Sequence, residues 1–348
     1  MDDKVELYVL GKKYQGFTDL TLDISMQAIS KKFELTLTDN WTHNGKEWFF
    51  APERACELKI NDKTLIKGFI DDVVPSLKSN TIVITGRDKT GDLVDCSVPS
   101  DKNEYREVTL LKLCEILCLP FSIMVTDNLN NNEIFKVFKT QPGEKIFKAL
   151  ERAAKVRGAL LVSDFDGNLV IEKKSVKKAH SFLKEGVNIY DGTATYSAKE
   201  RFSIYTALGQ QAGNDDLSPD DIANLKETAT DEGISRYRPL TILAEKTTNK
   251  AELKKRVEWE AIKRAADSSK ISIQTQGWTQ ENGDLWNINE LIRVESPFLG
   301  LDIDLLITEI KFTYADSLTT FTLKRKDSFE PKPTITKESK VEVWKELE

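Results

Sequence analysis

Residues 56–89 read CELKINDKTLIKGFIDDVVPSLKSNTIVITGRDK, and residues 291–327 read LIRVESPFLGLDIDLLITEIKFTYADSLTTFTLKRKD. Each stretch contains a strand, a turn, a long apolar strand, a polar turn and a closing strand, followed by a cluster of Arg, Asp and Lys. Alternation of apolar and polar residues between polar turns is the pattern of half-buried β-strands. We expect the two stretches to be copies of one β module whose strands share order and direction.

The strand pattern extends outward from both stretches. Toward the N-terminus, strands are expected over residues 5–9, 17–24 and 32–38, and short strands at regular spacing favour a small barrel or sandwich. Ahead of the second stretch, a strand is expected over residues 270–275, and an amphipathic helix over residues 250–267.

The chain between the copies changes character. Apolar residues at helical spacing predict helices over residues 107–119 and 144–157. A hairpin over residues 159–172 follows, turning at Asp166 and Gly167.

A second polar region precedes the helix at residues 250–267. Residues 210–235 are acidic and are expected to form an exposed loop or a short helix. The next segment, residues 236–246, is extended and contains Pro239, which predicts a position at the edge of a sheet because proline cannot donate a ladder hydrogen bond.

These patterns predict an α+β fold that is mainly β, with two similar small β-barrel domains and an inserted α/β region. The predicted boundaries are residues 1–95 for the first β domain, 96–190 for the inserted domain, 191–326 for the second β domain and 327–348 for a tail. The tail is poor in apolar residues and is expected to be a frayed end. The alternative is an anchor that docks on a neighbouring protein with Trp344 as its buried centre.

Composition sets further limits. The 348 residues are 40% hydrophobic and 30% charged, which is ordinary for a globular protein of two or three domains. The net charge is −6 without a basic stripe, so tight sequence-independent binding of nucleic-acid phosphates is not expected. No apolar run reaches the roughly 18 residues of a membrane span. The acidic, strand-like N-terminus is unlike a signal peptide, so we expect synthesis and folding in the cytosol.

The four cysteines do not predict a metal site. Cys114 and Cys118 lie four apart on an expected helix and therefore share one face. We interpret them as buried apolar thiols, because a tetrahedral zinc site needs two further ligands and the chain has only two unpaired histidines. The DFDGN sequence at residues 164–168 lacks the glycine and glutamate spacing of a calcium loop. No metal or cofactor is predicted.

The motif GRDKTGDL at residues 86–93 resembles motifs of proteins that bind or transfer phosphate. DKTG after a strand is the setting of the phosphorylated aspartate in P-type ATPases, and Gly86 and Gly91 have the spacing of a P-loop. A P-loop requires lysine and then serine or threonine after the second glycine, but Asp92 and Leu93 stand there. The ATPase motif would also require threonine in place of Asp92.

We therefore expect no phosphate chemistry and no catalytic residue. The charged residues Arg87, Asp88, Lys89 and Asp92 are instead expected to pair with one another at the mouth of a β module. On this interpretation, alanine in place of Asp88 or Lys89 would cost only the modest stability of a partly exposed ion pair.

Several longer blocks give a specific resemblance. FELTLTDNW, GFIDDVVP, ITGRDKTGDLVDCS, ALERAAKVRGALLVSDFDGNLVI, RYRPLTILAE, WEAIKRAADSSKISIQTQGW and LWNINELIRVESPFLGLDIDLLI follow one another as in the baseplate hub proteins of Mu-like contractile-tailed phages and prophages. The chain resembles this family from about residue 5 to residue 326, and the tail matches nothing in it.

The resemblance implies a structural protein of the virion tail baseplate, made in the host bacterial cytoplasm, that is not an enzyme. Hubs of this type are trimers whose subunits each carry two similar β-barrel tube domains, so that six barrels bridge a six-fold tail tube and a three-fold spike. The implied partners are the tail tube protein, the central spike and other baseplate proteins, without direct membrane insertion. DNA would only pass through the channel, which we expect to be acidic or neutral.

The residues that we single out are candidates for interfaces or for structural roles. They are Arg87, Asp88, Lys89, Asp92, Arg236, Tyr237, Arg238, Trp278, Trp286 and Trp344. Two alternatives stay open. The same part could belong to a tailocin or a type VI secretion system, and a faint likeness of residues 141–158 to a LysM module leaves a cell-wall glycan-binding or lytic hub.

Overall fold

The structure, a computed structural model, describes residues 4–38, 50–101, 103–173, 177–209, 225–243 and 250–326. The chain falls into two compact units. The first comprises Met1–Tyr190, Gln274–Ile292 and Ile307–Phe321, and the second comprises Asp191–Ile273, Arg293–Leu306 and Thr322–Glu348. The predicted domain boundaries remain predictions. The predicted tail with Trp344, and residues 210–224 of the acidic stretch, lie outside the described residues.

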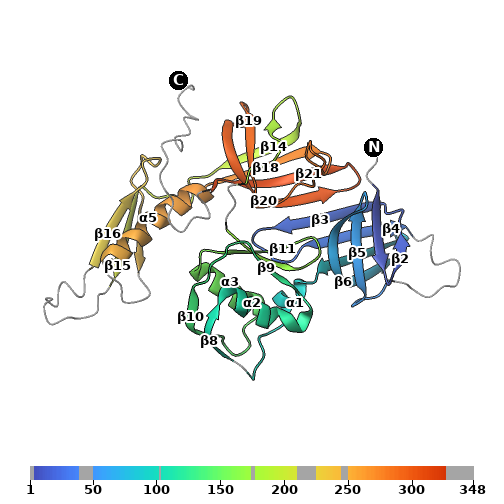
Figure 1. The fold of residues 1–348 in the computed structure, drawn as a ribbon. Helices are drawn as coiled ribbons and strands as arrows, with labels where there is room; N and C mark the ends of the chain where they lie inside the picture. The colour runs from blue at the N-terminus through green and yellow to red at the C-terminus, as the bar shows by residue number, and fades with distance from the viewer. Residues whose placement is uncertain are drawn as a thin grey trace. The chain divides into compact units, whose positions relative to one another are not determined.

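An antiparallel sheet forms much of the first unit (Figure 1). Its N-terminal strands are β1 (Val5–Val9), β2 (Lys12–Tyr14), β3 (Asp19–Ser25), β4 (Lys32–Thr38), β5 (Ala55–Ile60), β6 (Lys63–Ser76) and β7 (Thr81–Asp88). They are ordered β3-β4-β7-β6-β5-β1-β2, and each neighbouring pair is antiparallel. Alternate side chains such as Leu20, Leu22 and Ile24 of β3 are buried, as the sequence pattern predicts.

The second stretch of the repeat, together with strands that precede it in the chain, forms a matching set. They are β13 (Leu183–Lys184), β14 (Ile189–Tyr196), β18 (Ser269–Gln276), β19 (Leu291–Ser296), β20 (Leu301–Thr313) and β21 (Leu318–Lys324). Their order is β14-β18-β21-β20, with β19 next to β20 and β13 next to β19.

The two strand orders correspond one to one. β3-β4-β7-β6-β5-β1 in the first copy matches β14-β18-β21-β20-β19-β13 in the second. The connections from β19 to β20 and from β20 to β21 are residues 297–300 and 314–317, which are too short for a parallel crossover. These strands are therefore antiparallel like β5, β6 and β7, and the predicted repeat is confirmed in strand order and direction.

The two copies meet within the first unit. The C-terminal half of β20 pairs antiparallel with β3, with Glu309 opposite Ser25 and Thr313 opposite Thr21. The sheet path nevertheless ends at β14 and at β2. The described strands thus form a mainly β, α+β structure, but they do not close into the predicted barrels, because no described strand pairs with these two ends.

The inserted α/β region follows β7. Its elements are α1 (Gly91–Asp95), β8 (Glu104–Thr109), α2 (Leu110–Cys118), the 3-10 helix η2 (Leu119–Phe121), β9 (Val125–Asp127), β10 (Ile134–Lys139), α3 (Ile146–Val156), β11 (Leu160–Ser163) and β12 (Leu169–Glu172). The predicted hairpin is confirmed as the antiparallel pair β11 and β12, which turns at Gly167 with φ of 73°.

The start of the first predicted helix is wrong. Residues 107–109 belong to strand β8, which pairs with β10, and the helix begins only at Leu110. The cause is Thr109, whose hydroxyl accepts a hydrogen bond from the backbone N–H of Lys112 and so caps the helix there.

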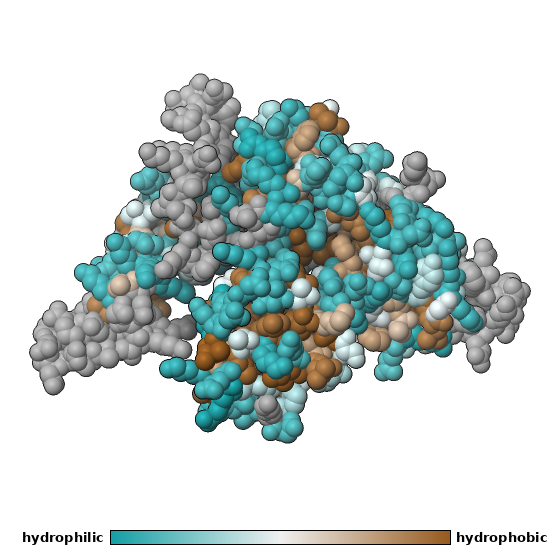
Figure 2. Space-filling view, in the orientation of Figure 1, coloured by the Kyte–Doolittle hydropathy of each residue, from teal (hydrophilic) through white to brown (hydrophobic). Residues whose placement is uncertain are grey.

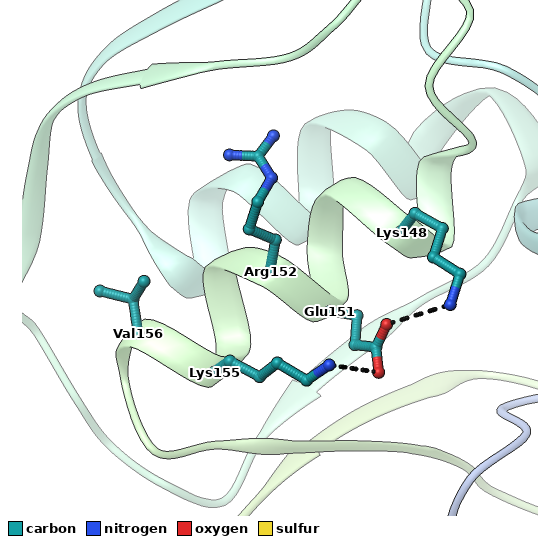
Figure 3. A pocket seen from close by; sticks show the side chains of 5 residues that line it. All are labelled: Lys148, Glu151, Arg152, Lys155 and Val156. Carbon is teal, nitrogen blue, oxygen red and sulfur yellow. Dashed lines mark hydrogen bonds and ion pairs between the residues drawn. The ribbon is translucent and has the colours of Figure 1, made fainter. Parts of the chain in front are cut away.

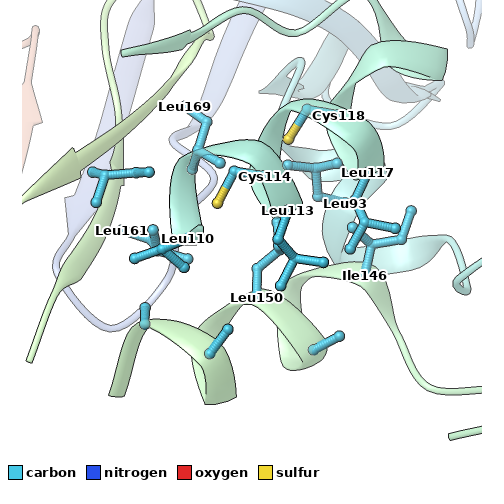
Figure 4. Close-up of a cluster of buried hydrophobic side chains, with 14 of the residues drawn as sticks. Leu93, Leu110, Leu113, Cys114, Leu117, Cys118, Ile146, Leu150, Leu161 and Leu169 are labelled. Atoms are coloured by element: carbon cyan, nitrogen blue, oxygen red, sulfur yellow. The ribbon is translucent and has the colours of Figure 1, made fainter. Parts of the chain in front are cut away.

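The helices α2 and α3 pack against each other over an apolar core (Figure 4). Leu113, Cys114 and Leu150 in this core are fully buried, and Cys118 is buried beside them. Burial raises the pKa of the Cys118 thiol to about 12. The two helical cysteines are therefore buried, protonated thiols, as predicted.

A second insertion lies between β14 and β18. It holds β15 (Ile204–Gly209), β16 (Leu225–Thr230), β17 (Pro239–Leu243) and α5 (Lys250–Asp267). The strand order is β16-β15-β17, so the predicted edge position of Pro239 is confirmed, as is the predicted helix. Leu253, Val257 and Ala261 of α5 form a small core with Tyr205 of β15.

One prediction for this insertion is wrong. Residues 225–230, predicted as part of a loop or short helix, form the strand β16 and pair antiparallel with β15. The segment LKETAT alternates, but only Leu225 and Ala229 on its inner face are apolar. Pairing with β15 thus decides its structure more than its own hydrophobicity does.

Apolar side chains are exposed on the first insertion, and Figure 2 shows apolar surface gathered in the lower centre of the view. Exposed members are Leu119, Met124, Ile134, Val137 and Val156. None of the helices in the described ranges combines the length and the apolarity that a bilayer crossing requires.

The insertion's core gives a matched pair of stability variants. Leu113 is 0% exposed and Leu119 is 76% exposed. Leu113→Ala should lower the free energy of unfolding by about 2 to 5 kcal/mol, because it leaves a cavity, whereas Leu119→Ala should change it by less than about 0.5 kcal/mol. Urea unfolding followed by circular dichroism measures both, and equal effects would contradict this packing.

Candidate functional site

The motif that first suggested chemistry is built around a buried carboxylate. Asp88, at the end of β7, is only 2% exposed. Its Oδ1 accepts hydrogen bonds from Ser30 Oγ at 3.0 Å, from Thr90 Oγ1 at 2.5 Å and from Thr90 N at 3.1 Å. Its Oδ2 accepts from Ser163 Oγ at 2.7 Å and from Lys31 N at 3.2 Å. Both oxygens are occupied, and the group joins three separate segments of the first unit.

A buried lysine lies beside this carboxylate without forming an ion pair with it. Lys31 is 3% exposed. Its Nζ donates to Ser163 O at 2.6 Å, Ser163 Oγ at 3.0 Å and Asp164 O at 2.5 Å, and lies 5.0 Å from the centre of the Phe165 ring. Burial lowers the pKa of Lys31 to about 8, against the attraction of Asp88 and Asp164. The hairpin between β11 and β12 is thus attached to the first β module.

The tip of the same hairpin packs closely on β6. A Cβ added at Gly167 would lie 2.7 Å from the backbone oxygen of Lys67, and φ at Gly167 is +73°. Only glycine fits both restrictions. Lys67 Nζ reaches Asp166 at 2.5 Å, and Lys89 Nζ reaches Asn168 at 3.2 Å.

The predicted mutual pairing of the charged residues in the motif is wrong. Arg87 forms a bidentate pair with Asp71, at 2.7 and 2.9 Å, and bonds Asp95 at 2.6 Å. Hydrogen bonds to these carboxylates raise the pKa of Arg87. Asp88 instead accepts hydrogen bonds from hydroxyl and backbone amide groups, and Lys89 donates to Asn168 of the hairpin. Burial raises the pKa of Asp92 against the attraction of Arg87.

This geometry leaves Asp88 no role as a phosphate acceptor. A nucleophilic carboxylate must present an oxygen to its substrate, but both oxygens of Asp88 are buried and hydrogen-bonded within the protein. In the described residues, no cluster of His, Cys, Asp and Glu is arranged to hold a metal ion. What the arrangement can do is fix the inserted region on the β module.

The remaining candidates divide into core and surface residues. Trp278 is 1% exposed, donates its indole N–H to Thr313 O at 3.2 Å and packs on Phe312. Trp286 is 3% exposed and makes an edge contact with Phe321 at 5.0 Å. Both are core residues of the first unit, so the structure supports a packing role for them.

The arginine-rich segment before β17 lies at the surface of the second unit. Arg236 is exposed and Tyr237 is 80% exposed. Arg238 is held in place, because its side chain donates to Lys199 O at 2.8 Å and its backbone N–H to Ser203 Oγ at 2.8 Å. An interface role for this segment remains a prediction.

A shallow depression lies on α3 (Figure 3) and is lined by Lys148, Glu151, Arg152, Lys155 and Val156. Glu151 pairs with Lys155 at 2.9 Å and with Lys148 at 3.4 Å. The depression falls within the segment that resembles a LysM module, but none of its lining side chains is aromatic. It therefore offers no stacking surface for a sugar ring.

Sequence reasoning found Asp88 but missed its partners. Ser30 and Ser163 lie 58 and 75 residues from it in the chain. Lys31 carried no signal either, because a lysine next to a strand is normally solvated. The one local signal toward this site is the apolar run ALLVS at residues 159–163, which predicts that the hairpin around Ser163 is buried.

Family models cover most of the chain in four segments. Residues 4–88 match the N-terminal domain of Mu phage baseplate assembly protein GpP-like proteins, and residues 90–173 match the second domain of baseplate hub protein gp44-like proteins. Residues 201–258 match the third domain of tail protein NMB1110-like proteins, and residues 248–332 match the fourth domain of Mu phage baseplate assembly protein GpP.

Whole proteins are similar over nearly the full length. The baseplate hub protein gp44 of Escherichia phage Mu is 28% identical over 326 residues, which is 91% of this chain and 85% of that protein. The crystal structure of the 43 kDa tail protein of prophage MuSo2 from Shewanella oneidensis is 35% identical, with a TM-score of 0.83, over 95% of this chain and all (100%) of that one. The tail protein from Neisseria meningitidis MC58 shares the fold, with 22% identity and a TM-score of 0.77 over 95% of this chain and 99% of that one.

The buried carboxylate predicts a large effect of substitution, contrary to the modest effect expected from sequence. Asp88→Ala should lower the free energy of unfolding by about 3 to 5 kcal/mol, because it leaves the buried donors around it without an acceptor. Asp95→Ala, at a half-exposed ion pair, should cost about 1 kcal/mol or less. Urea unfolding compares the two, and a small loss for Asp88→Ala would contradict the network.

Lys31 predicts a pH dependence. Its pKa is about 8 in the folded chain and about 10.4 when unfolded, so the unfolded chain binds more protons between these values. The contribution of Lys31 to stability should therefore rise with pH from about 8 to about 10.4. The free energy of unfolding of the wild type minus that of Lys31→Met should be constant below about pH 8 and increase above it. Denaturant unfolding across this range measures the difference, and a flat profile would contradict the buried lysine.

Proposed function

Because this chain belongs to the family of Mu-like phage baseplate hub proteins, we propose that it forms a trimeric ring joining the tail tube to the central spike. The membership rests on the close match to the MuSo2 tail protein over its full length. The protein is thus a phage baseplate hub, which associates with other baseplate and tail proteins and with a spike. The stoichiometry, the ring and the channel are the parts that we propose.

The internal repeat is the observation that carries the proposal. Each chain holds two copies of one strand order, β3-β4-β7-β6-β5 and β14-β18-β21-β20-β19. Three such chains around an axis present six similar modules, which suits a ring that faces a six-fold tube on one side and a three-fold spike on the other. We propose that each module completes its barrel-like tube domain in this assembly.

The role that we propose is structural rather than enzymatic. Asp88, at the centre of the most chemical-looking motif, is buried and used to attach the inserted region. The exposed apolar side chains of that region, Ile134 and Val137 among them, suit contacts with other baseplate proteins. With a net charge of −6, the proposed lumen is acidic or neutral and lets DNA pass without gripping it.

The phage assignment is favoured over a tailocin or a type VI secretion system. Two of the matching family models, over residues 4–88 and 248–332, are those of Mu phage baseplate assembly proteins, and the models over residues 90–173 and 201–258 are those of a baseplate hub protein and a tail protein. The glycan-binding alternative gains no support from the depression on α3.

The proposal predicts the oligomeric state of the purified chain. Sedimentation equilibrium at micromolar concentration and neutral pH should give a mass of three times the 39.5 kDa chain. Averaged electron micrographs of the same particle should show a ring with six similar lobes. A monomer that persists at these concentrations would contradict the proposed ring.

A further inference from the structure

Two of the strand edges that remain unpaired among the described residues belong to β14 and to the C-terminal part of β6. β14 lies at one end of the sheet path and has β18 as its only neighbour there. In β6, the residues Asp72–Ser76 pair with β7 on one side. On the other side, the partner strand β5 reaches only to Phe69. Backbone N–H and C=O groups on both edges are therefore available for a further strand.

β14 corresponds to β3 in detail. Residues 19–25 read DLTLDIS and residues 191–197 read DGTATYS, with Asp, Thr and Ser at the same places. Asp19 accepts a hydrogen bond from the next backbone N–H at 2.8 Å, and Asp191 does the same at 2.8 Å. Ser25 Oγ accepts from the N–H two residues later at 3.1 Å, and Ser197 Oγ likewise at 3.2 Å. Residue 195 is thus the counterpart of residue 23.

β6 corresponds to β20 in the same way. Each long strand is followed by a connection of equal length, residues 77–80 after β6 and residues 314–317 after β20. Counting back from these connections places residues 72–76 of β6 opposite residues 309–313 of β20 in the alignment of the two copies. Residues 309–313 are the part of β20 that pairs with β3.

The pair β3 and β20 is made within one chain, whereas its counterpart, β14 and β6, is not among the strand pairs of the described residues. We propose that β14 of one subunit adds as an antiparallel strand to residues 72–76 of β6 in a second copy of this chain. The register follows from the internal pair, in which Lys311 lies opposite Asp23. Val74 of one subunit should therefore lie opposite Thr195 of the next.

The backbone directions agree with this pairing. Ser197 N–H bonds Ser268 O on the side of β18, so that in β14 the alternate residues Gly192, Ala194 and Tyr196 direct their backbone groups to the open edge. In β3, Leu20 O likewise accepts from Tyr314 N on the side of β20. Residues 192 and 20 are counterparts, so the two strands present the same groups outward.

The edge of β6 that receives the added strand has a restriction of its own. Asp88 N–H bonds Lys31 O on the side of β4, so that Thr81, Val83 and Thr85 of β7 face β6. Their partners Ser76, Val74 and Asp72 then face β7, which leaves Val73 and Pro75 facing the open edge. Pro75 has no N–H to donate, so Val73 supplies the strand's main hydrogen bonds to the added strand.

Exposed apolar side chains lie along both edges. Val74 in β6 is 54% exposed, and Leu77, which follows this strand, is 102% exposed. On β14, Tyr190 is 70% exposed and Tyr196 is 40% exposed. Addition of the strand would cover apolar surface on both partners. Because one chain offers two different edges, β14 and residues 72–76 of β6, the contact is head-to-tail and closes only as a ring. The number of subunits in that ring rests on the proposed function.

Cysteine cross-linking tests the pairing. Val74 directs its backbone groups to β7 and Thr195 directs its own to β18, so between subunits they form a non-hydrogen-bonded pair with Cα atoms about 4.5 Å apart. That distance lies within the range of a disulfide. A Val74→Cys chain and a Thr195→Cys chain, carrying tags of different size, are coexpressed and oxidised. Most of the scarcer chain should run as a covalent heterodimer on a non-reducing gel.

The matched control is Thr193→Cys, which is exposed like Thr195 and lies on the same face of β14. With Val74→Cys it forms only a diagonal pair, about 7 to 8 Å apart, which exceeds the reach of a disulfide. The heterodimer should be lost in this mixture. It should also be absent from the wild type, in which Cys56, Cys114 and Cys118 are buried and Cys96 is partly buried; the wild-type sample shows whether Cys96 contributes a band of its own.

Sedimentation of the same samples separates this inference from the proposed function. A trimer without the Val74–Thr195 cross-link would overturn the edge pairing and leave the ring intact. A trimer that cross-links better through Thr193 would overturn the register. A monomer without any cross-link would overturn the ring and the pairing together.

Discussion

The antiparallel ladder between β3 and β20 is the interaction on which the rest of the first unit depends, because it is where the two copies of the module meet. β3 buries Leu22 at 0% exposure and Ile24 at 2% exposure. Its outer backbone groups would be unpaired without β20, and unpaired polar groups next to a buried face are costly. The length of β20 follows from this requirement. It has 13 residues against 7 in its neighbour β21, and the extra length supplies the edge that β3 needs.

The sequence predicted the strands that carry strong alternation. β1 and β4 begin and end at the predicted residues, because each has large apolar residues on one face and a polar turn beyond it. β14 gave no such signal. The positions that correspond to the buried Leu20 and Leu22 of β3 hold Gly192 and Ala194, so the structure of β14 depends on pairing with β18 rather than on its own composition.

The sequence predicted one residue of the candidate site but not its partners, because those partners are set by tertiary structure. A strand that ends in Asp-Lys-Thr-Gly attracts notice, and Asp88 is indeed a special residue. Its partners are set by tertiary structure, since Ser30 and Ser163 are distant in sequence and both residue types are common on surfaces. No local pattern distinguishes a serine that will bond a buried carboxylate from one that will be solvated.

Asp88 and Lys31 are buried close together, yet each is satisfied mainly by neutral groups. Burying charge costs stability, and apolar residues of equal size would often serve stability as well or better. Hydrogen bonds restrict direction in a way that apolar contacts do not. Ser163 donates to Asp88 and accepts from Lys31, so the hairpin has one orientation on the module in which both charges are satisfied. We interpret the pair as fixing the orientation of the insertion rather than as raising stability.

The difference in side chains between β3 and β14 has a physical reason if β14 pairs only with a second subunit. β3 is covered as soon as its own chain folds, so it can carry large apolar side chains. An uncovered edge with the same side chains would be a site for aggregation. In β14 the corresponding positions are Gly192, Ala194 and the amphipathic Tyr196, and the facing edge of β6 contains Pro75, which weakens indiscriminate strand addition. One strand order therefore serves two needs. The internal pair forms as the chain folds and is apolar. The two edges that pair between subunits stay polar enough to remain soluble until they meet.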